Sequence, residues 1–526
     1  MAMSDTAKAE ASSNERALAL LTITVMLGMI MAIIDATIVN VALATMAGNL
    51  GTSIDEISWV ATGYILSTVV VMPLNGFLTA VFGRKLYYAF SIAVFTAASF
   101  LCGTAKSVWI LVFYRVLQGF GGGALQPTAQ AILFESYPAE RRGQAMAIFG
   151  IGAMLGPALG PTLGGWIVDN YNWPLIFYIN VPIGIAAMLM TLAYVPDPRY
   201  IERRSIRTVD WTGLTMMTAG LASLQYVLER GQHDDWYNSN TIVVLTIVAV
   251  VGIGLFVWRQ LAVAHPIVDL KVFRIRSFTA GNVLVIVLGF GLFGTSLILP
   301  LFFQTLLRFN AFQTGLALLP GAIATAIAMP MAGRLVDKID GRLPVLFGML
   351  LFGLSTWWMG NLDQNAGYWD IFWPRVWQGF SLAFIFVPLS TVTMAAVPRA
   401  ETANASGIFN LLRQLGGSLG IAVLTTILQR DQTSAYHNLA NGVTMHNPSV
   451  QAAIDRMTQF FMAHGHTFFE AQRLALLQFA NMVLINAQTI SYDDLFRLSG
   501  LVFFAVLPLI VLLKNPRPGK QPQLTA

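Results

Sequence analysis

The sequence predicts an all-α polytopic membrane protein of fourteen transmembrane helices, built as two six-helix halves with two helices inserted between them. Three observations support this fold class: an apolar composition, a series of apolar stretches about 20 residues long, and an internal repeat. Of the 526 residues, 56% are hydrophobic and only 11% are charged, and the mean hydropathy is +0.65. Charged residues make up roughly a quarter of a soluble globular protein. The composition therefore excludes a soluble protein.

Apolar stretches of about 20 residues can cross the hydrocarbon core of a bilayer as α-helices. They predict fourteen spans, at residues 17–46, 58–80, 86–105, 108–134, 143–168, 174–195, 210–229, 241–262, 277–306, 312–336, 343–361, 369–397, 402–429 and 494–513. An even number of spans places both termini on one side of the membrane. Residues 1–16 are polar and no small-residue cleavage site follows the first span, so we expect a retained helix rather than a signal peptide.

The cationic residues between the spans predict the orientation of the chain. If the chain begins inside, 21 of its 31 Lys and Arg residues fall in cytoplasmic segments, seven fall in outer segments and three lie within spans. An excess of Lys and Arg marks cytoplasmic loops. We therefore expect cytoplasmic tails at 1–16 and 514–526. Because the cations are scattered among short loops, they do not form the basic face of a nucleic-acid-binding protein.

Two motifs recur along the chain in register. Arg115-Val-Leu-Gln-Gly-Phe120 returns 260 residues later as Arg375-Val-Trp-Gln-Gly-Phe380, and the loop from Gly76 to Lys85 has a looser counterpart, Gly333 to Arg342, 257 residues later. This spacing indicates a duplication, with halves at 17–195 and 277–513 and an insert at 196–276 that carries two spans. Transporters of this kind bind their substrate between the two halves.

The longest outer segment, residues 430–492, is not expected to be random coil. Val450, Ile454, Met457 and Phe461 recur at helical spacing. The first interpretation is a set of amphipathic helices that lie on the outer leaflet of the bilayer. The second is a docking surface for a partner outside the membrane.

Four charged residues lie within the spans, and Asp35 is the only acid among them. A charge in a membrane costs at least about 2.5 to 3.5 kcal/mol, so such residues mark functional sites by default. Counted from the helix midpoints, Asp35 and Arg115 lie at similar depths in antiparallel spans. We expect Asp35 to exchange protons in a central cavity with Arg115 as its partner. The alternative is a static ion pair that only fixes helix packing.

The two remaining arginines within the spans, Arg375 and Arg413, have different predicted roles. Arg375 lies near the start of its span, so we expect its side chain to extend to the outer interface. Arg413 lies too deep for that and either caps carbonyl groups, pairs with a polar side chain or attracts anionic substrates. The residues that we expect to line the substrate cavity, beside Asp35 and Arg413, are Asn40, Gln118, Gln126, Asn180, Gln304, Gln378 and Asn410.

Three motifs together carry a family resemblance. The loop motif contains Gly76, Gly83, Arg84 and Lys85, the second is Arg115-x-x-Gln118-Gly119, and the third is the fifth-span run from Gly156 to Gly165. Small residues at four-residue spacing let helices approach closely. The set resembles the signature motifs of the major facilitator superfamily. The fifth-span run is similar to that superfamily's antiporter motif, whose residues here are Gly156, Pro157, Gly160, Pro161, Gly164 and Gly165.

Further segments resemble the fourteen-helix drug:proton antiporter branch, and within it the EmrB-type multidrug exporters. They are Asp35 to Leu43, Ile179 to Gly184, Asp210 to Gly213, Glu229 to Gly231 with Trp236, and Pro266 to Leu270. The resemblance covers nearly the whole chain. It implies the major facilitator fold and the export of hydrophobic or amphipathic compounds in exchange for protons. It also implies a bacterial inner membrane, a periplasmic membrane-fusion adaptor and, through it, an outer-membrane channel, with no cofactor other than the proton gradient.

The sequence departs from that pattern in two places. Ala80 stands where the loop motif usually has an acid, whereas the second copy keeps Asp337, and Ala44 replaces a usual proline. Other classes of protein fit less well, because no Gly-x-x-x-x-Gly-Lys-Ser/Thr run provides a nucleotide site and all six His residues fall in predicted loops, away from any metal cluster. An enzyme is therefore not expected. A proton-coupled importer of a small metabolite on the same fold is the remaining alternative.

Overall fold

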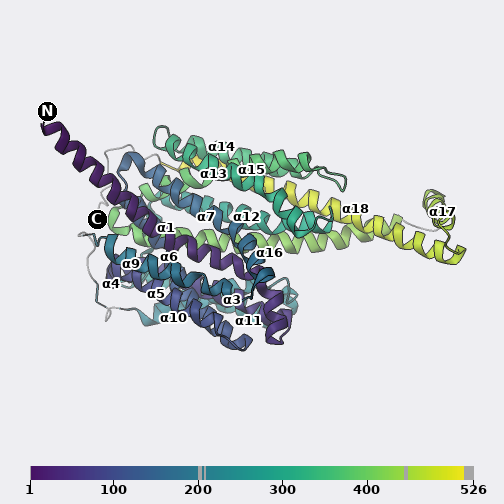
Figure 1. The fold of residues 1–526 in the computed structure, drawn as a ribbon, viewed down its shortest axis with the longest axis horizontal. Coiled ribbons are helices and arrows are strands. Elements are labelled where there is room, and N and C mark those ends of the chain that lie inside the picture. The colour runs from purple at the N-terminus through teal and green to yellow at the C-terminus, as the bar shows by residue number, and fades with distance from the viewer. Residues whose placement is uncertain (1, 199–203, 206–208, 443–447, 515–526) are drawn as a thin grey trace.

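A computed structural model describes residues 2–198, 204–205, 209–442 and 448–514. Every regular element within these ranges is an α-helix or a short 3-10 helix, which confirms the predicted all-α fold. The long helices run along roughly one common direction, whereas α17 lies across it (Figure 1). We call the end of the bundle at which α1 begins the N-end, and the opposite end, beyond which α16 and α18 project, the hairpin end.

The first half contains six long helical passages, two of which are interrupted. Its elements are α1 (Ala2–Leu50), α2 (Ile54–Ile57), α3 (Trp59–Val71), α4 (Asn75–Phe82), α5 (Arg84–Gly103), α6 (Val108–Ser136), α7 (Arg142–Asn170), α8 (Leu175–Tyr178) and α9 (Asn180–Tyr194). The predicted span 58–80 is broken by the 3-10 turn Met72–Leu74 between α3 and α4. Pro73 lies in this turn, and a proline cannot donate the backbone hydrogen bond that continues an α-helix.

The insert and the second half follow. Their elements are α10 (Trp211–Arg230), α11 (Asn240–Ala262), α12 (Arg276–Thr305), α13 (Ala311–Val336), α14 (Arg342–Met359), α15 (Tyr368–Ala395), α16 (Thr402–Gly442), α17 (Pro448–Ala463) and α18 (Phe468–Ala505). Among the described residues, thirteen helices are long and apolar enough to cross a membrane. The one predicted span that is missing from these thirteen, 210–229, coincides with α10, which is as long as α5 but contains several Thr, Ser and Gln residues and so falls short in hydropathy.

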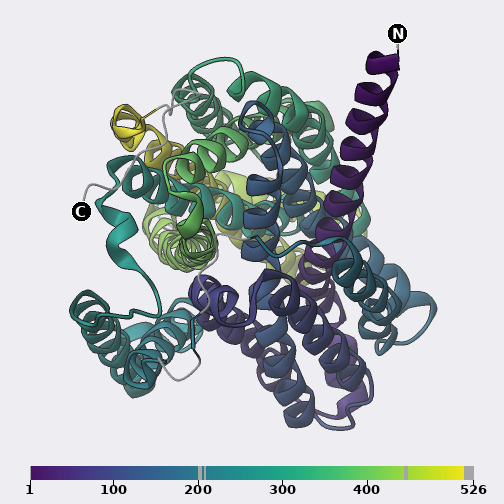
Figure 2. The same ribbon diagram turned by 90° about the vertical axis from the view of Figure 1, so that its left-hand side faces the viewer.

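The inserted pair packs on the outside of the two halves (Figure 2). α10 contacts α3 of the first half and α16 of the second half. On one side the rings of Tyr226 and Trp59 lie 5.6 Å apart. On the other side Gln225 Nε2 donates to Ser418 Oγ at 2.8 Å. α10 therefore bridges the two halves.

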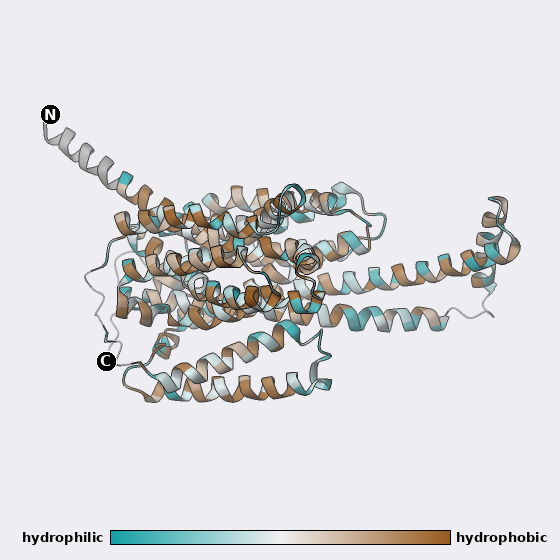
Figure 3. Cartoon of the chain, turned by 60° about the horizontal axis from the view of Figure 1, so that its bottom comes forward, coloured by the Kyte–Doolittle hydropathy of each residue, from teal (hydrophilic) through white to brown (hydrophobic). Residues whose placement is uncertain are grey.

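The segment 430–492 is helical in almost all of its described part. α16 and α18 continue without a break beyond the bundle, and α17 lies at their tip (Figures 1 and 3). Val450 and Ile454 are buried against α18, and Met457 and Phe461 pack beside them, which confirms the predicted helical face. The helices do not fold back along the end of the bundle, so the interpretation as helices lying on the membrane surface is wrong for most of this segment. It forms a projecting hairpin because α16 and α18 pack on each other as continuous helices.

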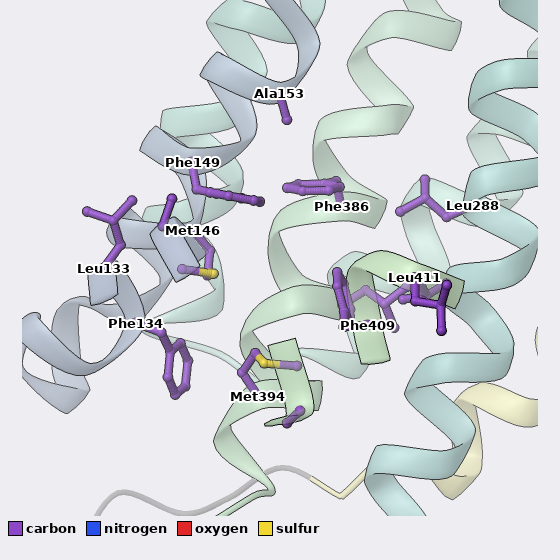
Figure 4. Packing of buried hydrophobic residues seen from close by; sticks show 14 of the residues in the cluster. Leu133, Phe134, Met146, Phe149, Ala153, Leu288, Phe386, Met394, Phe409 and Leu411 are labelled. Atoms are coloured by element: carbon purple, nitrogen blue, oxygen red, sulfur yellow. The ribbon is translucent and has the colours of Figure 1, made fainter. Parts of the chain in front are cut away.

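The two halves contact each other near the N-end. The neighbours of α7 change along its length and show where this contact stops. In its first turns α7 faces α13, since a Cβ at Gly150 would lie 2.8 Å from Met329 Sδ. The rings of Phe149 and Phe386 stack across the same interface at 6.0 Å (Figure 4). Toward the hairpin end α7 instead faces α1 of its own half, where a Cβ at Gly156 would overlap the side chain of Ile33. The halves therefore contact each other mainly through their N-end portions.

Candidate functional site

The structure brings Asp35 of α1 and Arg115 of α6 into direct contact. Arg115 Nη1 donates to Asp35 Oδ2 at 2.5 Å, and the two side chains are only 1% and 0% exposed. The predicted pairing of these residues is thus present in the structure. Charge-assisted hydrogen bonds of this length are among the strongest in proteins, and a buried carboxylate needs such partners because it has lost its water.

Two amides complete the shell around the carboxylate. Gln118 Nε2 and Asn180 Nδ2 donate to Asp35 Oδ1 at 2.9 and 2.7 Å. Asn180 also donates to Ser99 Oγ at 3.0 Å. Both oxygens of Asp35 therefore have donors, and the polar cluster extends over α1, α5, α6 and α9.

The guanidinium of Arg115 is held on its other sides as well. Its Nε donates to the carbonyl oxygen of Val60 at 3.1 Å, its Nη1 also donates to Gln118 Oε1 at 2.7 Å, and the ring of Tyr64 lies 4.1 Å from its central carbon. Sequence reasoning missed Tyr64 and Ser99. An aromatic residue and a serine in apolar spans carry no signal of their own, and only the packing of α3 and α5 on α6 shows their part.

The position of this cluster corrects one expectation. Asp35, Gln118 and Asn180 were expected to line a cavity between the halves, but each hydrogen bond described for Asp35 comes from a residue of the first half. Asp35, Gln118 and Asn180 are all buried. They are enclosed because α1 packs on α6 and α9, and α5 packs on the same two helices. In this conformation the ion pair lies inside one half.

A second polar cluster joins the two halves. Arg413 Nη2 of α16 donates to Gln126 Oε1 of α6 at 2.6 Å and to Asn410 Oδ1 at 3.2 Å. Asn410 Nδ2 in turn donates to Gln130 Oε1 of α6 at 2.6 Å. The structure thus brings together three of the predicted cavity residues. It adds Gln130, which lies one helical turn after Gln126 and could have been found from that spacing.

The repeated motif has repeated geometry in the second half. Arg375 Nη1 donates to Gln378 Oε1, and its Nη2 donates to the carbonyl oxygen of Leu318 at 3.4 Å. The prediction that Arg375 extends to the outer interface is therefore wrong, because α13 offers a carbonyl acceptor beside it. No acid faces this arginine among its described partners. Thr295, which follows Asp35 by 260 residues, bonds instead to the carbonyl of Gly291 at 2.6 Å.

Two predicted cavity residues, Asn40 and Gln304, take part in none of these polar clusters. Asn40 and Gln304 are exposed, and no hydrogen bond is described for either side chain. Their amides lie toward the hairpin end of α1 and α12, where the helices do not enclose them. Neither residue joins the polar cluster around Asp35, and their part in lining a cavity stays a prediction.

The fifth-span run packs α7 closely against α1. A Cβ at Gly160 would overlap Thr37 Oγ1, and a Cβ at Gly164 would lie 2.7 Å from Ile38. By contrast, a Cβ at Gly165 would only touch Val41 at 3.9 Å. Pro161 is exposed on the other side of the helix, and the side chain of Pro157 lies outside the described residues. Three of the four glycines thus allow the approach of the helix that carries Asp35.

The two loop motifs lie at the N-end, where the halves touch. A Cβ at Gly76 would lie 2.8 Å from the backbone of Asn404 on α16, and Gly83 has a φ of 81° that ends α4. Arg84 pairs with Glu135 at 2.6 Å, and the backbone N–H of Lys85 donates to Asp197 Oδ1 at 2.9 Å.

The second copy of the loop makes a contact between the halves. Asp337 Oδ1 accepts from the backbone N–H of Gly143 at 2.7 Å, at the start of α7. Burial raises the pKa of the Asp337 carboxyl above its ordinary value, while the Gly143 N–H opposes this change. A carboxylate at a helix N-terminus is stabilised by the helix dipole. The acid that the first loop lacks at Ala80 is thus present in the second loop.

Comparisons with known proteins agree with this architecture. The family model described as the Major Facilitator Superfamily matches residues 25–421. The chain is 35% identical over 500 residues to the multidrug export protein EmrB of Escherichia coli K12, covering 95% of this chain and 96% of the relative. It is 34% identical to the fatty acid resistance protein FarB of Neisseria gonorrhoeae, over 95% and 97% of the two chains.

A third relative and two solved structures complete the comparison. The colistin resistance protein EmrB of Acinetobacter baumannii is 30% identical, over 92% and 94% of the two chains. The human organic anion transporter MFSD10 superposes with a TM-score of 0.57 at 13% identity, covering 92% and 99% of the two chains. The proton:xylose symporter XylE superposes with a TM-score of 0.58 at 14% identity, covering 94% and 97%. The two structures show that the fold is shared.

Proposed function

Because the chain belongs to the major facilitator superfamily and is similar over 95% of its length to multidrug export proteins, we propose that it exports hydrophobic or amphipathic drugs and toxic compounds in exchange for protons. The protein is a transporter, and the proton gradient is its proposed source of energy. The proposed location is the bacterial inner membrane, with the N-end on the cytoplasmic side. The excess of Lys and Arg in the loops of that end supports this orientation.

The buried pair of Asp35 and Arg115 carries the proposal of proton coupling. A proton on Asp35 removes the negative charge, so the ion pair becomes a weaker hydrogen bond from the Arg115 cation to a neutral carboxylic acid. The hydrogen bonds that Arg115, Gln118 and Asn180 donate to Asp35 then end on a neutral carboxyl, which is a weaker acceptor than the carboxylate. Because Asp35 lies on α1 and its donors lie on α6 and α9, uptake of a proton weakens the packing of α1 against these two helices.

The geometry at the N-end connects this change to alternating access. In the present conformation the halves touch at the proposed cytoplasmic end, through Gly76 with Asn404 and through Asp337 with Gly143. Glycines of α7 pack against α1, the helix that carries Asp35. A shift of α1 on protonation therefore acts on α7, whose first turn belongs to the contact between the halves. Separation of the halves there would admit substrate from the cytoplasm.

Proton-driven export in proteoliposomes tests this proposal. With an imposed pH gradient, the Asp35→Asn variant should lose export, whereas Asp363→Asn, which changes an exposed acid outside the helices, should keep it. Export by Asp35→Asn at the rate of the unmodified protein would reduce the ion pair to a structural role.

A proton-coupled importer is the competing function, since the same fold also serves a proton:xylose symporter. The relatives of 30 to 35% identity are named for export or resistance, which favours export. In a strain that lacks the protein, cellular accumulation of a hydrophobic dye should rise. A fall in accumulation would favour import.

We further propose that the hairpin of residues 430–492 docks a periplasmic membrane-fusion adaptor, and through it an outer-membrane channel. The hairpin projects from the proposed outer end of the bundle (Figure 3). Large apolar side chains remain exposed on it, including Phe469 at 81% and Leu477 at 60%. An exposed apolar patch of this kind is typical of a protein interface.

The adaptor proposal is tested by co-purification. The double variant Phe469→Ser with Leu477→Ser should lose the adaptor while it keeps transport in proteoliposomes, because both residues lie far from Asp35 along the chain. The matched variant Gln472→Ser with Gln478→Ser changes neighbouring polar residues of the same helix and should keep the adaptor. Equal recovery of the adaptor with both double variants would rule out docking through this face.

A further inference from the structure

Arg413 holds a buried charge with no acid beside it. Its side chain is 3% exposed, and its described acceptors are the neutral amide oxygens of Gln126 and Asn410. The Nε atom of Arg413 is buried and has no hydrogen-bond partner. Among the residues that the structure describes, no carboxylate forms an ion pair with this arginine. A buried charge without a counter-charge is unfavourable unless something completes it.

Asp35 cannot supply the missing charge. Its two oxygens already accept hydrogen bonds from Arg115, Gln118 and Asn180. Arg115 is thus neutralised by Asp35, whereas Arg375 and Arg413 have only neutral acceptors among their described partners, and of these two only Arg413 bonds to a residue of the other half. This difference sets Arg413 apart from a structural ion pair.

Arg413 lies at the boundary between the two halves and beside apolar side chains. Gln126 belongs to α6 of the first half and Arg413 to α16 of the second half, so their hydrogen bond breaks when the halves move apart. The ring of Phe386 lies 6.0 Å from the guanidinium and stacks on Phe149 of α7. Figure 4 shows these two rings pointing toward each other from facing helices. A charged group thus lies next to aromatic side chains at an interface that must open.

We propose that Arg413 binds the anionic group of amphipathic acids. When no substrate is bound, the amide oxygen of Gln126 accepts the hydrogen bond from the guanidinium instead. The planar guanidinium matches the two oxygens of a carboxylate or sulfonate, and the neighbouring phenylalanines suit an apolar or aromatic body. The inference rests on the proposed export function, since it names the substrate class of that exporter. Gln126 is a suitable placeholder because its neutral amide satisfies one donor without neutralising the charge.

The test compares two dyes that differ only in charge. One is a naphthalene sulfonate, which is anionic at all accessible pH values, and the other is the uncharged sulfonamide of the same ring system. Binding to the purified protein is measured by fluorescence, and export is measured in proteoliposomes. In Arg413→Gln, binding of the sulfonate should weaken at least tenfold, while binding of the sulfonamide should change less than twofold.

Three further variants sharpen the test. Gln126→Glu places a carboxylate on Arg413 and should exclude the sulfonate while it still accepts the sulfonamide. Arg413→Lys keeps the charge and should retain most of the preference for the anion, even if Arg413→Gln folds poorly. Arg375→Gln removes the repeat counterpart of Arg115, an arginine whose described acceptors are also neutral but lie within the second half, and should leave the preference unchanged.

The possible outcomes separate the inference from the function on which it rests. Equal loss of both dyes in Arg413→Gln and Gln126→Glu would overturn the inference and leave a packing role for Arg413. Export of the sulfonamide but not the sulfonate by the unmodified protein would overturn the anionic substrate class while export stands. Export of neither dye would contradict the proposed function itself.

Discussion

At the scale of single residues, Asp35 remains in an apolar bundle because protein donors replace its water. Removing one donor from a buried acceptor costs about 1–3 kcal/mol. The contribution of each donor can be measured separately, because the shell contains one cation and two amides on different helices.

Asn180→Leu removes one donor from Asp35 Oδ1. We expect the midpoint of thermal unfolding in detergent to fall and proton-driven export to drop several-fold, since the carboxylate loses part of its shell. Ser99→Ala is the matched control, because it removes the second partner of Asn180 but leaves the donors of Asp35 in place. If both variants behaved alike, the hydrogen bond from Asn180 to Asp35 would have no special weight.

His233 gives the turn after α10 a pH-dependent contact. Its ring nitrogens lie 2.8 Å from Asp234 and 3.0 Å from Asp55, and these hydrogen bonds raise the pKa of His233. A raised pKa in the folded state means that the contribution to stability is complete below the ordinary value of about 6.5 and is lost as the pH rises through the raised value. Asp55 precedes α3, so this contact ties the insert to the first half.

His233→Gln should therefore lower the unfolding midpoint at pH 6 and have little effect at pH 9. The measurement is thermal unfolding in detergent at both pH values. His265→Gln changes an exposed histidine outside this contact and serves as control. A loss of equal size at pH 6 and pH 9 would show that the protonated form of His233 contributes nothing extra.

At the scale of elements, the contact between α7 and α1 depends on glycines whose surroundings differ. A Cβ at Gly160 would overlap Thr37 Oγ1, whereas a Cβ at Gly165 has room. Overpacking of a close interface costs about 1–3 kcal/mol. The fifth-span motif can therefore be divided into glycines that the packing requires and one that it does not.

Gly160→Ala should lower both the unfolding midpoint and the rate of export, because the added methyl group forces α7 away from α1. Gly165→Ala should leave both close to those of the unmodified protein. The comparison uses the same proteoliposome assay for the two variants. Tolerance of alanine at Gly160 would mean that α7 and α1 are further apart in the working protein.

At the scale of the whole molecule, α10 must follow one half when the halves move. Its contacts with α3 include the Trp59 and Tyr226 rings and the guanidinium of Arg230, 5.4 Å from the Trp59 ring. Its contacts with α16 include the hydrogen bond from Gln225 to Ser418. The aromatic contact is the larger one, so we expect α10 to stay with α3 and to slide against α16.

A disulfide between Gln225→Cys and Ser418→Cys should therefore block export until a reductant is added. The control is a disulfide between Trp59→Cys and Tyr226→Cys, within the unit that we expect to move together, which should leave export intact. The opposite pattern would assign α10 to the second half.

Much of the fold could be predicted from the sequence, because transmembrane helices need long apolar stretches and the chain repeats itself. Asp35 and Arg115 could be paired from their depths alone. The enclosure of their pair inside one half could not, since it depends on how tightly α5 and α9 close over Asn180. Arg375 was placed wrongly because sequence shows how far a side chain lies from the interface but not the carbonyl of Leu318 beside it. The hairpin was missed because its helices are continuous with spans that were expected to end at the membrane.

The continuity of α16 has a mechanical consequence. One unbroken helix carries Arg413 within the bundle and ends at Gly442 near the hairpin tip. At about 1.5 Å per residue, about 44 Å of helix separates these two residues. A rotation of about 10° about Arg413 would then carry the far end of the helix sideways by about 8 Å for this length. The helix thus acts as a lever arm. If the hydrogen bond between Arg413 and Gln126 forms or breaks with such a rotation, a partner bound at the far end of α16 is displaced by more than the length of a side chain.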